Sequence, residues 1–100
     1  MQYEIHGTTT ETFANLRSVF YDQFASHGEI GASVCIWHRG KRVVDLWGGY
    51  QDLDAKIQWQ ANTMTTIFSC TKGLVASCFL LLVDRGEIDY DDLVSKYWTT

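Results

Sequence analysis

The sequence predicts an α+β fold in which helices flank an antiparallel β-hairpin. Three patterns indicate this class: helical periodicity in residues 10–27, two β-rich runs in residues 31–49, and a long apolar helix in residues 69–85. The chain has 100 residues, 46% of them apolar and 14% aromatic, which suits one globular domain or a part of one. It is too short for two ordinary domains.

The charge pattern excludes some classes of partner. The net charge is −4, and acidic and basic residues are interspersed, so we expect no nucleic-acid partner. Residues 1–30 lack the basic start and apolar run of a secretory signal peptide, which favours an intracellular location. The longest apolar stretch, residues 74–83, is about half the length of a bilayer span, so we expect no membrane-spanning helix.

The cysteines predict neither disulfides nor a metal site. Cys35, Cys70 and Cys78 form no CxxC pair and have no metal-type spacing with the histidines. We interpret them as reduced thiols of the core. No metal or other cofactor is expected.

The first predicted helix covers residues 10–27. Thr10 stands where an N-cap is needed, and Gly28 where a left-handed residue ends a helix. Apolar residues recur at three- and four-residue steps, at Phe13, Leu16, Val19, Phe20 and Phe24. This pattern is typical of an amphipathic helix.

A β-hairpin is predicted next. Its strands are expected at residues 32–38 and 42–47, joined by a turn at Gly40, with Gly48 and Gly49 closing the second strand. A polar connection should follow over residues 50–63. Apolar residues fill adjacent as well as alternate strand positions, so both faces of the hairpin should be covered. One amphipathic helix cannot supply both covers.

The second predicted helix follows a β-prone run at residues 65–68. It should begin near Ser69 or Cys70 and end at Arg85, with Gly86 as the left-handed residue. Apolar side chains surround most of its circumference, so we expect it to be buried on all sides. Asp91 or Asp92 is then placed to cap a short helix through residues 94–97.

Ser69 and Lys72 are the candidate catalytic residues. Their spacing puts them on one face of the helix, so the lysine amine can reach the serine hydroxyl. Burial and the positive end of the helix dipole both favour the neutral amine, which is the form that acts as a base. The free amides of the first turn can stabilise an oxyanion. These features predict an activated serine with a lysine base.

A structural interpretation of the same two residues stays open. Ser69 could be an ordinary N-cap, with the ammonium group of Lys72 extending to water. S-x-x-K alone does not separate the two readings, because short patterns of this kind recur by chance.

Two longer tracts carry a family resemblance: GASVCIWHRGKRVVDLWGGYQD and FSCTKGLVASCFLLLVDRGEIDYDDLVSKYW. Over about residues 10–98 the chain resembles the serine β-lactamase / penicillin-binding-protein superfamily. Within it, the chain is similar to the β-lactamase-related serine hydrolases, which include family VIII carboxylesterases and animal β-lactamase-domain-containing proteins. The resemblance implies a β-lactamase-like fold, Ser69 as the acylated nucleophile, Lys72 as its base, and a small-molecule ester or amide substrate.

The same resemblance shows what this sequence lacks. The family also uses a tyrosine, usually in Y-x-N, and a late K-T-G or H-x-G strand that supplies a second oxyanion amide. No tyrosine of the chain is followed two residues later by asparagine. His38, Arg39 and Gly40 match H-x-G, but they precede the nucleophile, so we interpret His38 as a surface residue at a strand end.

We therefore expect residues 1–100 to be the N-terminal part of a longer β-lactamase-related domain. That domain would complete a five-stranded antiparallel sheet and bury the S-x-x-K helix beneath a helical lobe. The isolated chain should be inactive, or nearly so. The alternative is a non-catalytic truncated homologue that acts as an interaction or assembly module and self-associates through its exposed core surface.

Overall fold

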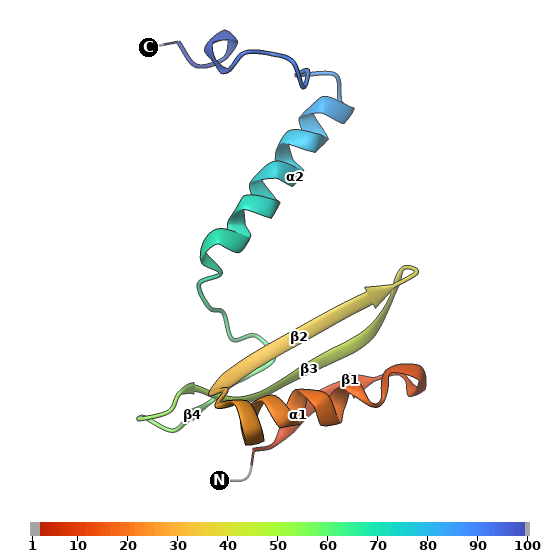
Figure 1. Cartoon of the computed structure of the whole chain (residues 1–100), viewed down its shortest axis with the longest axis vertical. Coiled ribbons are helices and arrows are strands. Elements are labelled where there is room, and N and C mark those ends of the chain that lie inside the picture. Colours follow the sequence, from red (N-terminus) through yellow and green to blue (C-terminus); the bar gives the residue numbers. More distant parts are fainter. Residues whose placement is uncertain (1–2, 100) are drawn as a thin grey trace. The chain divides into compact units, whose positions relative to one another are not determined.

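The computed structural model describes residues 3–99 and confirms the α+β class. The chain forms two compact units that divide between Met64 and Thr65. The first unit contains β1 (Ile5–Thr9), a 3₁₀ turn (Glu11–Phe13), α1 (Leu16–His27), β2 (Gly31–His38), β3 (Lys41–Asp52) and β4 (Ile57–Gln58). The second contains a 3₁₀ turn (Phe68–Cys70), α2 (Thr71–Asp84) and η3, a 3₁₀ turn at Val94–Lys96 (Figure 1).

The predicted hairpin is present as β2 and β3. Both central residues of its turn have positive φ, 50° at Arg39 and 75° at Gly40, as the tight turns of twisted hairpins require. The prediction that Gly48 and Gly49 close the second strand is wrong, because β3 continues to Asp52. At these glycines neighbouring backbone comes close: a Cβ on Gly49 would lie 2.1 Å from the carbonyl oxygen of Ile30.

Strand β1 was not predicted. It pairs antiparallel with β3 and gives the sheet order β1-β3-β2, while β4 pairs with the far end of β3. The short sequence Ile-His-Gly-Thr-Thr has little strand-like apolar content. Gly7 joins the sheet at φ 95°, and a Cβ there would lie 1.9 Å from the carbonyl oxygen of Asp45.

The core of the first unit lies between the sheet and α1. Val44 and Leu46 are fully buried and Phe24 is 3% exposed. Phe13, Leu16, Phe20, Val34 and Ile36 pack against the buried cluster of Val43, Val44 and Leu46. On β2, Ser33 and Cys35 alternate with Val34 and Ile36 and are exposed. Within the first unit, α1 therefore covers one face of the hairpin, and the second cover that the sequence predicts does not come from this unit.

The helix boundaries differ slightly from those predicted. Gly28 ends α1 in the left-handed conformation, at φ 75°, as expected. The α-helix begins at Leu16 instead of following Thr10, because a 3₁₀ turn intervenes. Cys35, Cys70 and Cys78 are unpaired thiols as predicted, but all three are exposed, so their assignment to the core is wrong.

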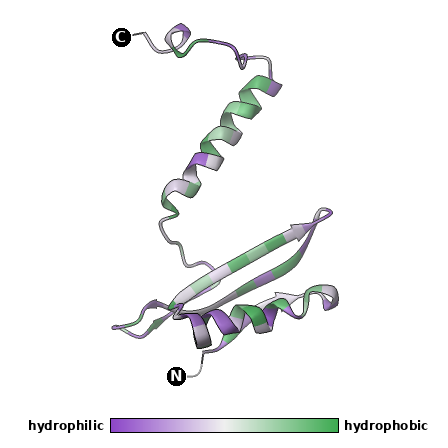
Figure 2. Ribbon diagram, viewed as in Figure 1, coloured by the Kyte–Doolittle hydropathy of each residue, from purple (hydrophilic) through white to green (hydrophobic). Residues whose placement is uncertain are grey.

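Helix α2 ends as the sequence predicts but is not buried. The amide of Glu87 donates to the carbonyl of Leu82, and that of Gly86 to Val83, which together form a Schellman motif around Gly86. Within the described helix no residue is buried, and Leu74 and Phe79 are 60% and 58% exposed. Figure 2 shows the apolar colour along the helix. Among the described residues of the second unit, the segment after Gly86 lines a pocket together with the C-terminal half of the helix.

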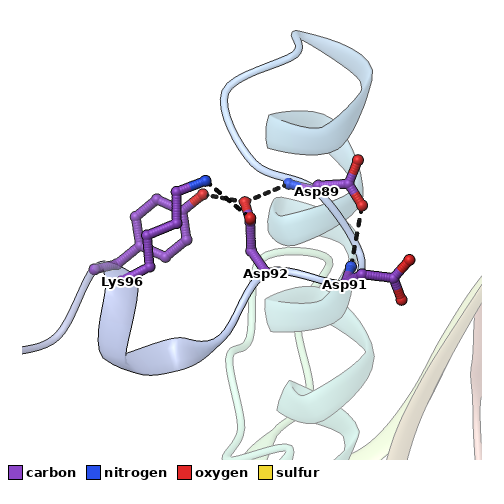
Figure 3. A network of polar contacts seen from close by, with 5 residues as sticks. Asp89, Asp91, Asp92 and Lys96 are labelled. Carbon is purple, nitrogen blue, oxygen red and sulfur yellow. Dashed lines mark hydrogen bonds and ion pairs between the residues drawn. The ribbon is translucent and has the colours of Figure 1, made fainter.

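That segment is held by a network around Asp92 (Figure 3). The Asp92 carboxylate accepts hydrogen bonds from the amide of Asp89 at 2.9 Å, from Lys96 Nζ at 2.8 Å and from the hydroxyl of Tyr97. Neither Asp91 nor Asp92 caps η3, whose N-cap residue is Leu93, so that prediction is wrong. The network lowers the pKa of Asp92 from 3.8 to about 2, mainly through the hydrogen bond from Lys96 and next through the hydrogen bond from Tyr97.

Among the described residues, no helix is long and apolar enough to cross a bilayer.

We predict that Gly7→Ala unfolds the sheet much more readily than Gly28→Ala. Both glycines have positive φ, but a Cβ at Gly28 meets nothing within 4 Å, whereas at Gly7 it collides with backbone. Gly28→Ala should cost about 1 kcal/mol from conformation alone, and Gly7→Ala more than about 3 kcal/mol. Urea unfolding followed by circular dichroism measures both. Equal losses would contradict the close approach of β1 to β3.

We predict that Asp92→Asn removes an acid-dependent part of the stability. Because folding lowers the pKa of Asp92, its ionised form stabilises the second unit above pH 3.8, and this contribution disappears as the pH falls through about 2. The variant should unfold more easily at neutral pH and lose that part of the pH dependence. Thermal unfolding across this pH range provides the measurement. Asp91→Asn is the matched control, since the network uses the backbone amide of Asp91, and it should behave like the unmodified chain.

Candidate active site

Ser69 and Lys72 lie at the start of the helical segment of the second unit, Ser69 in the 3₁₀ turn and Lys72 in the first turn of α2. The predicted contact between them is present: Lys72 Nζ donates a hydrogen bond to Ser69 Oγ at 2.9 Å. The spacing of three residues places both side chains on one face. The structure therefore brings together the two residues that the sequence selects as catalytic candidates.

The backbone before Ser69 is strained. Phe68 has φ 45°, a left-handed conformation that costs a residue with a Cβ about 1–2 kcal/mol. The amide of Cys70 then closes the 3₁₀ turn on the carbonyl of Ile67 at 3.0 Å. Strain of this kind concentrates at functional sites. The sequence gives no sign of it, because residues 65–68 read as β-prone, whereas residues 65–67 adopt no regular structure.

The N-cap interpretation of Ser69 does not fit this geometry. Ser69 lies inside the 3₁₀ turn, and the residues preceding the 3₁₀ turn and α2 are Ile67 and Cys70. Across these described residues neither N-cap position makes a side-chain capping bond. The contact of the Ser69 hydroxyl is with Lys72, as a nucleophile and its base require.

The expected burial of Lys72 is not found. Both Ser69 and Lys72 are exposed, because within the second unit little packs around the N-terminal half of α2. The positive end of the helix dipole remains beside the amine. In the observed hydrogen bond the amine is the donor. Base catalysis needs the opposite direction, in which a neutral amine accepts the hydroxyl proton.

An open depression of about 620 Å³ surrounds the pair. It contains Ser69, Thr71 and Lys72, and its remaining lining is apolar: Phe68, Val75, Ala76 and Phe79. Val75 and Phe79 follow Lys72 on the same helix face at three- and seven-residue spacing. The serine hydroxyl thus stands at the polar end of an apolar strip.

Other candidate groups lie elsewhere. His38 ends β2, is exposed, and leads into the hairpin turn, in agreement with its interpretation as a strand-end residue. The hydroxyl of Tyr97 is engaged with Asp92 and not with Ser69. Over residues 3–99, no three His, Cys, Asp or Glu side chains form a group that could hold a metal ion.

A serine and a lysine joined by a hydrogen bond at the start of an apolar helix have the arrangement expected of a Ser-Lys nucleophile pair. Comparison with known families agrees with this class, because the Beta-lactamase family model matches residues 16–100. The chain belongs to the β-lactamase family.

Individual relatives agree. The Esterase/beta-lactamase LipL of Mycobacterium tuberculosis is 33% identical over 94 residues, which are 94% of this chain and 22% of that protein. Protein flp of Staphylococcus aureus is 36% identical over 67 residues, which are 67% of this chain and 14% of flp. Among solved structures, a family VIII carboxylesterase matches with a TM-score of 0.90 and 38% identity over 95% of this chain and 26% of that one.

The fold is that of the N-terminal part of a β-lactamase-like esterase, which confirms the predicted architecture. The chain spans about a quarter of the length of the relatives that match nearly all of it.

Proposed function

We propose that this chain is the nucleophile-bearing, N-terminal part of a serine hydrolase that cleaves an ester or amide through an acyl-enzyme on Ser69. The observation that carries the proposal is the 2.9 Å contact between Lys72 Nζ and Ser69 Oγ. Membership of the β-lactamase family and the names of the relatives, an esterase/β-lactamase and a family VIII carboxylesterase, support the same reaction class.

In the proposed reaction the neutral amine of Lys72 accepts the hydroxyl proton while Ser69 Oγ bonds to the carbonyl carbon of the substrate. The carbonyl electron pair moves onto oxygen, where first-turn amides can donate to it. As the tetrahedral species collapses, the bond to the alkoxide or amine breaks, and the leaving group takes the proton from the Lys72 ammonium. Water then releases the acyl group by the reverse sequence.

An ester is the favoured substrate over a β-lactam. The tracts Val44–Gly49 and Val83–Asp92 carry the likeness to β-lactamase-related esterases. The matched solved structure is a carboxylesterase, and LipL carries both activities in its name. The apolar lining beside Ser69 is compatible with an uncharged acyl group.

The 100-residue chain by itself should be inactive. The family tyrosine and the late strand with its second oxyanion donor have no counterpart in this sequence. Lys72 is also exposed in this chain, so water reaches its side chain. Activity would require further protein to dry the amine and complete the oxyanion site.

We predict that a fluorophosphonate probe labels Ser69 in a longer form that contains the later strands, and leaves the 100-residue chain unlabelled. In the longer form, Ser69→Ala should abolish labelling, and Lys72→Met should slow it by about 10² to 10⁴-fold, the usual contribution of a positioned base. Labelling rates and the modified peptide are read by mass spectrometry.

Ser77→Ala is the matched control, because Ser77 is on the same helix and its hydroxyl donates to the carbonyl of Gly73. This variant should label at the unmodified rate. Failure to label any form, or labelling that survives Ser69→Ala, would refute the proposed nucleophile.

A second candidate function is a non-catalytic interaction or assembly module. It is favoured by the exposed apolar surface of α2, where Leu74, Val75, Phe79, Leu80 and Leu81 are each 48–60% exposed. Few monomeric proteins leave such a surface uncovered.

For this candidate we predict that gel filtration of the 100-residue chain shows association that increases with concentration and is unchanged by Ser69→Ala. Replacing Leu74 and Leu81 by glutamine should reverse it, because both exposed side chains lose their apolar surface. A cooperatively unfolding monomer at every concentration would exclude the module.

A further inference from the structure

Strand β1 forms one edge of the sheet. Its hydrogen-bond pairing with β3 shows which of its backbone amides and carbonyls face away from the sheet. The amide of Thr10 donates to the carbonyl of Val43 at 2.9 Å, so Thr10 points its backbone groups at β3. By the alternation of an antiparallel ladder, His6 and Thr8 also face β3, while Ile5, Gly7 and Thr9 face away from the sheet. Such a row of outward amides and carbonyls can pair with another strand.

One side chain occupies that edge. From the first turn of α1, Arg17 reaches across to β1, where Nη1 donates to the carbonyl of Ile5 at 2.9 Å and Nη2 donates to the carbonyl of Gly7 at 2.6 Å. These are two successive outward carbonyls. Both bonds are partly buried and carry the guanidinium charge, so each should be stronger than a neutral hydrogen bond at the surface.

We propose that Arg17 guards this edge and prevents β1 from pairing with β1 of a second copy of the chain. The edge is self-complementary, because two antiparallel β1 strands would offer each other the same outward amides and carbonyls, as a two-fold interface requires. A depression of about 580 Å³ lies where the start of β1 meets the first turns of α1, and Ile5 and Arg17 are among the residues that line it. The guanidinium of Arg17 occupies the carbonyl acceptors of Ile5 and Gly7, on which such pairing depends.

The type of side chain at position 17 determines how many edge carbonyls it can satisfy. The planar fork of arginine satisfies two carbonyls at once, whereas the ammonium of lysine is a single point donor on a flexible stem. Methionine resembles the aliphatic part of the arginine side chain in shape and donates no hydrogen bond. Arg17→Met should therefore open the edge with little loss of packing, and Arg17→Lys should open it in part.

The test is the mass of the folded chain measured by sedimentation velocity over a range of concentrations, with the fold checked by circular dichroism. Relative to the unmodified chain, the weight-average mass of Arg17→Met should rise toward twofold, and that of Arg17→Lys should rise by less. Adding Thr9→Pro to Arg17→Met should restore the original mass, because proline removes an outward amide of β1. Arg85→Met, which loses the same charge from the second unit, should leave the mass unchanged.

Association through α2 would not respond to these changes, so the comparison isolates the β1 edge. A folded Arg17→Met chain with the mass of the unmodified protein would overturn the proposal, as would association that persists with Thr9→Pro. If Arg17→Met fails to fold, Arg17→Lys provides the test instead. An unchanged mass for Arg17→Lys would then contradict the proposal that Arg17 prevents pairing at this edge.

Discussion

The contact between Ser69 and Lys72 is the interaction on which the proposed hydrolase activity depends, and the three-residue spacing produces it. Three residues on a helix return to the same face, so the amine meets the hydroxyl as soon as the first turn forms. The turn begins through Phe68 in a left-handed conformation, which a non-glycine residue adopts only at a cost. The backbone therefore stores strain directly beside the proposed nucleophile.

The apolar surface of α2 and the side chain of Lys72 are exposed for the same reason: little of the second unit packs around this helix. Burying one large aliphatic or aromatic side chain contributes roughly 1.5–3 kcal/mol, and α2 carries several that are about half exposed. Protein that covered this helix would gain that free energy and would also displace water from the amine at its start. In the proposed hydrolase, the packing that stabilises α2 is thus the packing that allows Lys72 to act as a neutral base.

Local signals in the sequence predicted local structure well. Gly28 and Gly86 end their helices because each must adopt positive φ, and the hairpin turn forms at Arg39 and Gly40 for the same reason. Features that depend on distant contacts were missed. Strand β1 exists because Gly7 lets its backbone approach Asp45, and β3 passes through Gly48 and Gly49 because glycine permits close neighbours there. From the sequence alone no structure is predicted for residues 5–9, and Gly48 and Gly49 are taken as a strand end, since a glycine needed for close approach looks like a glycine that breaks a strand.

In each unit, beside a small core, one charged side chain satisfies several polar groups. In the first unit the buried cluster is centred on Val43, Val44 and Leu46, and Arg17 adds two hydrogen bonds that tie α1 to the edge strand. In the second unit, where the described helix contributes no buried residue, Asp92 gathers three donors and folds the chain after Gly86 back on itself. Such contacts are specific in geometry, whereas apolar burial is not directional. They can hold each unit in one conformation, but they do not replace the apolar free energy that α2 leaves unused.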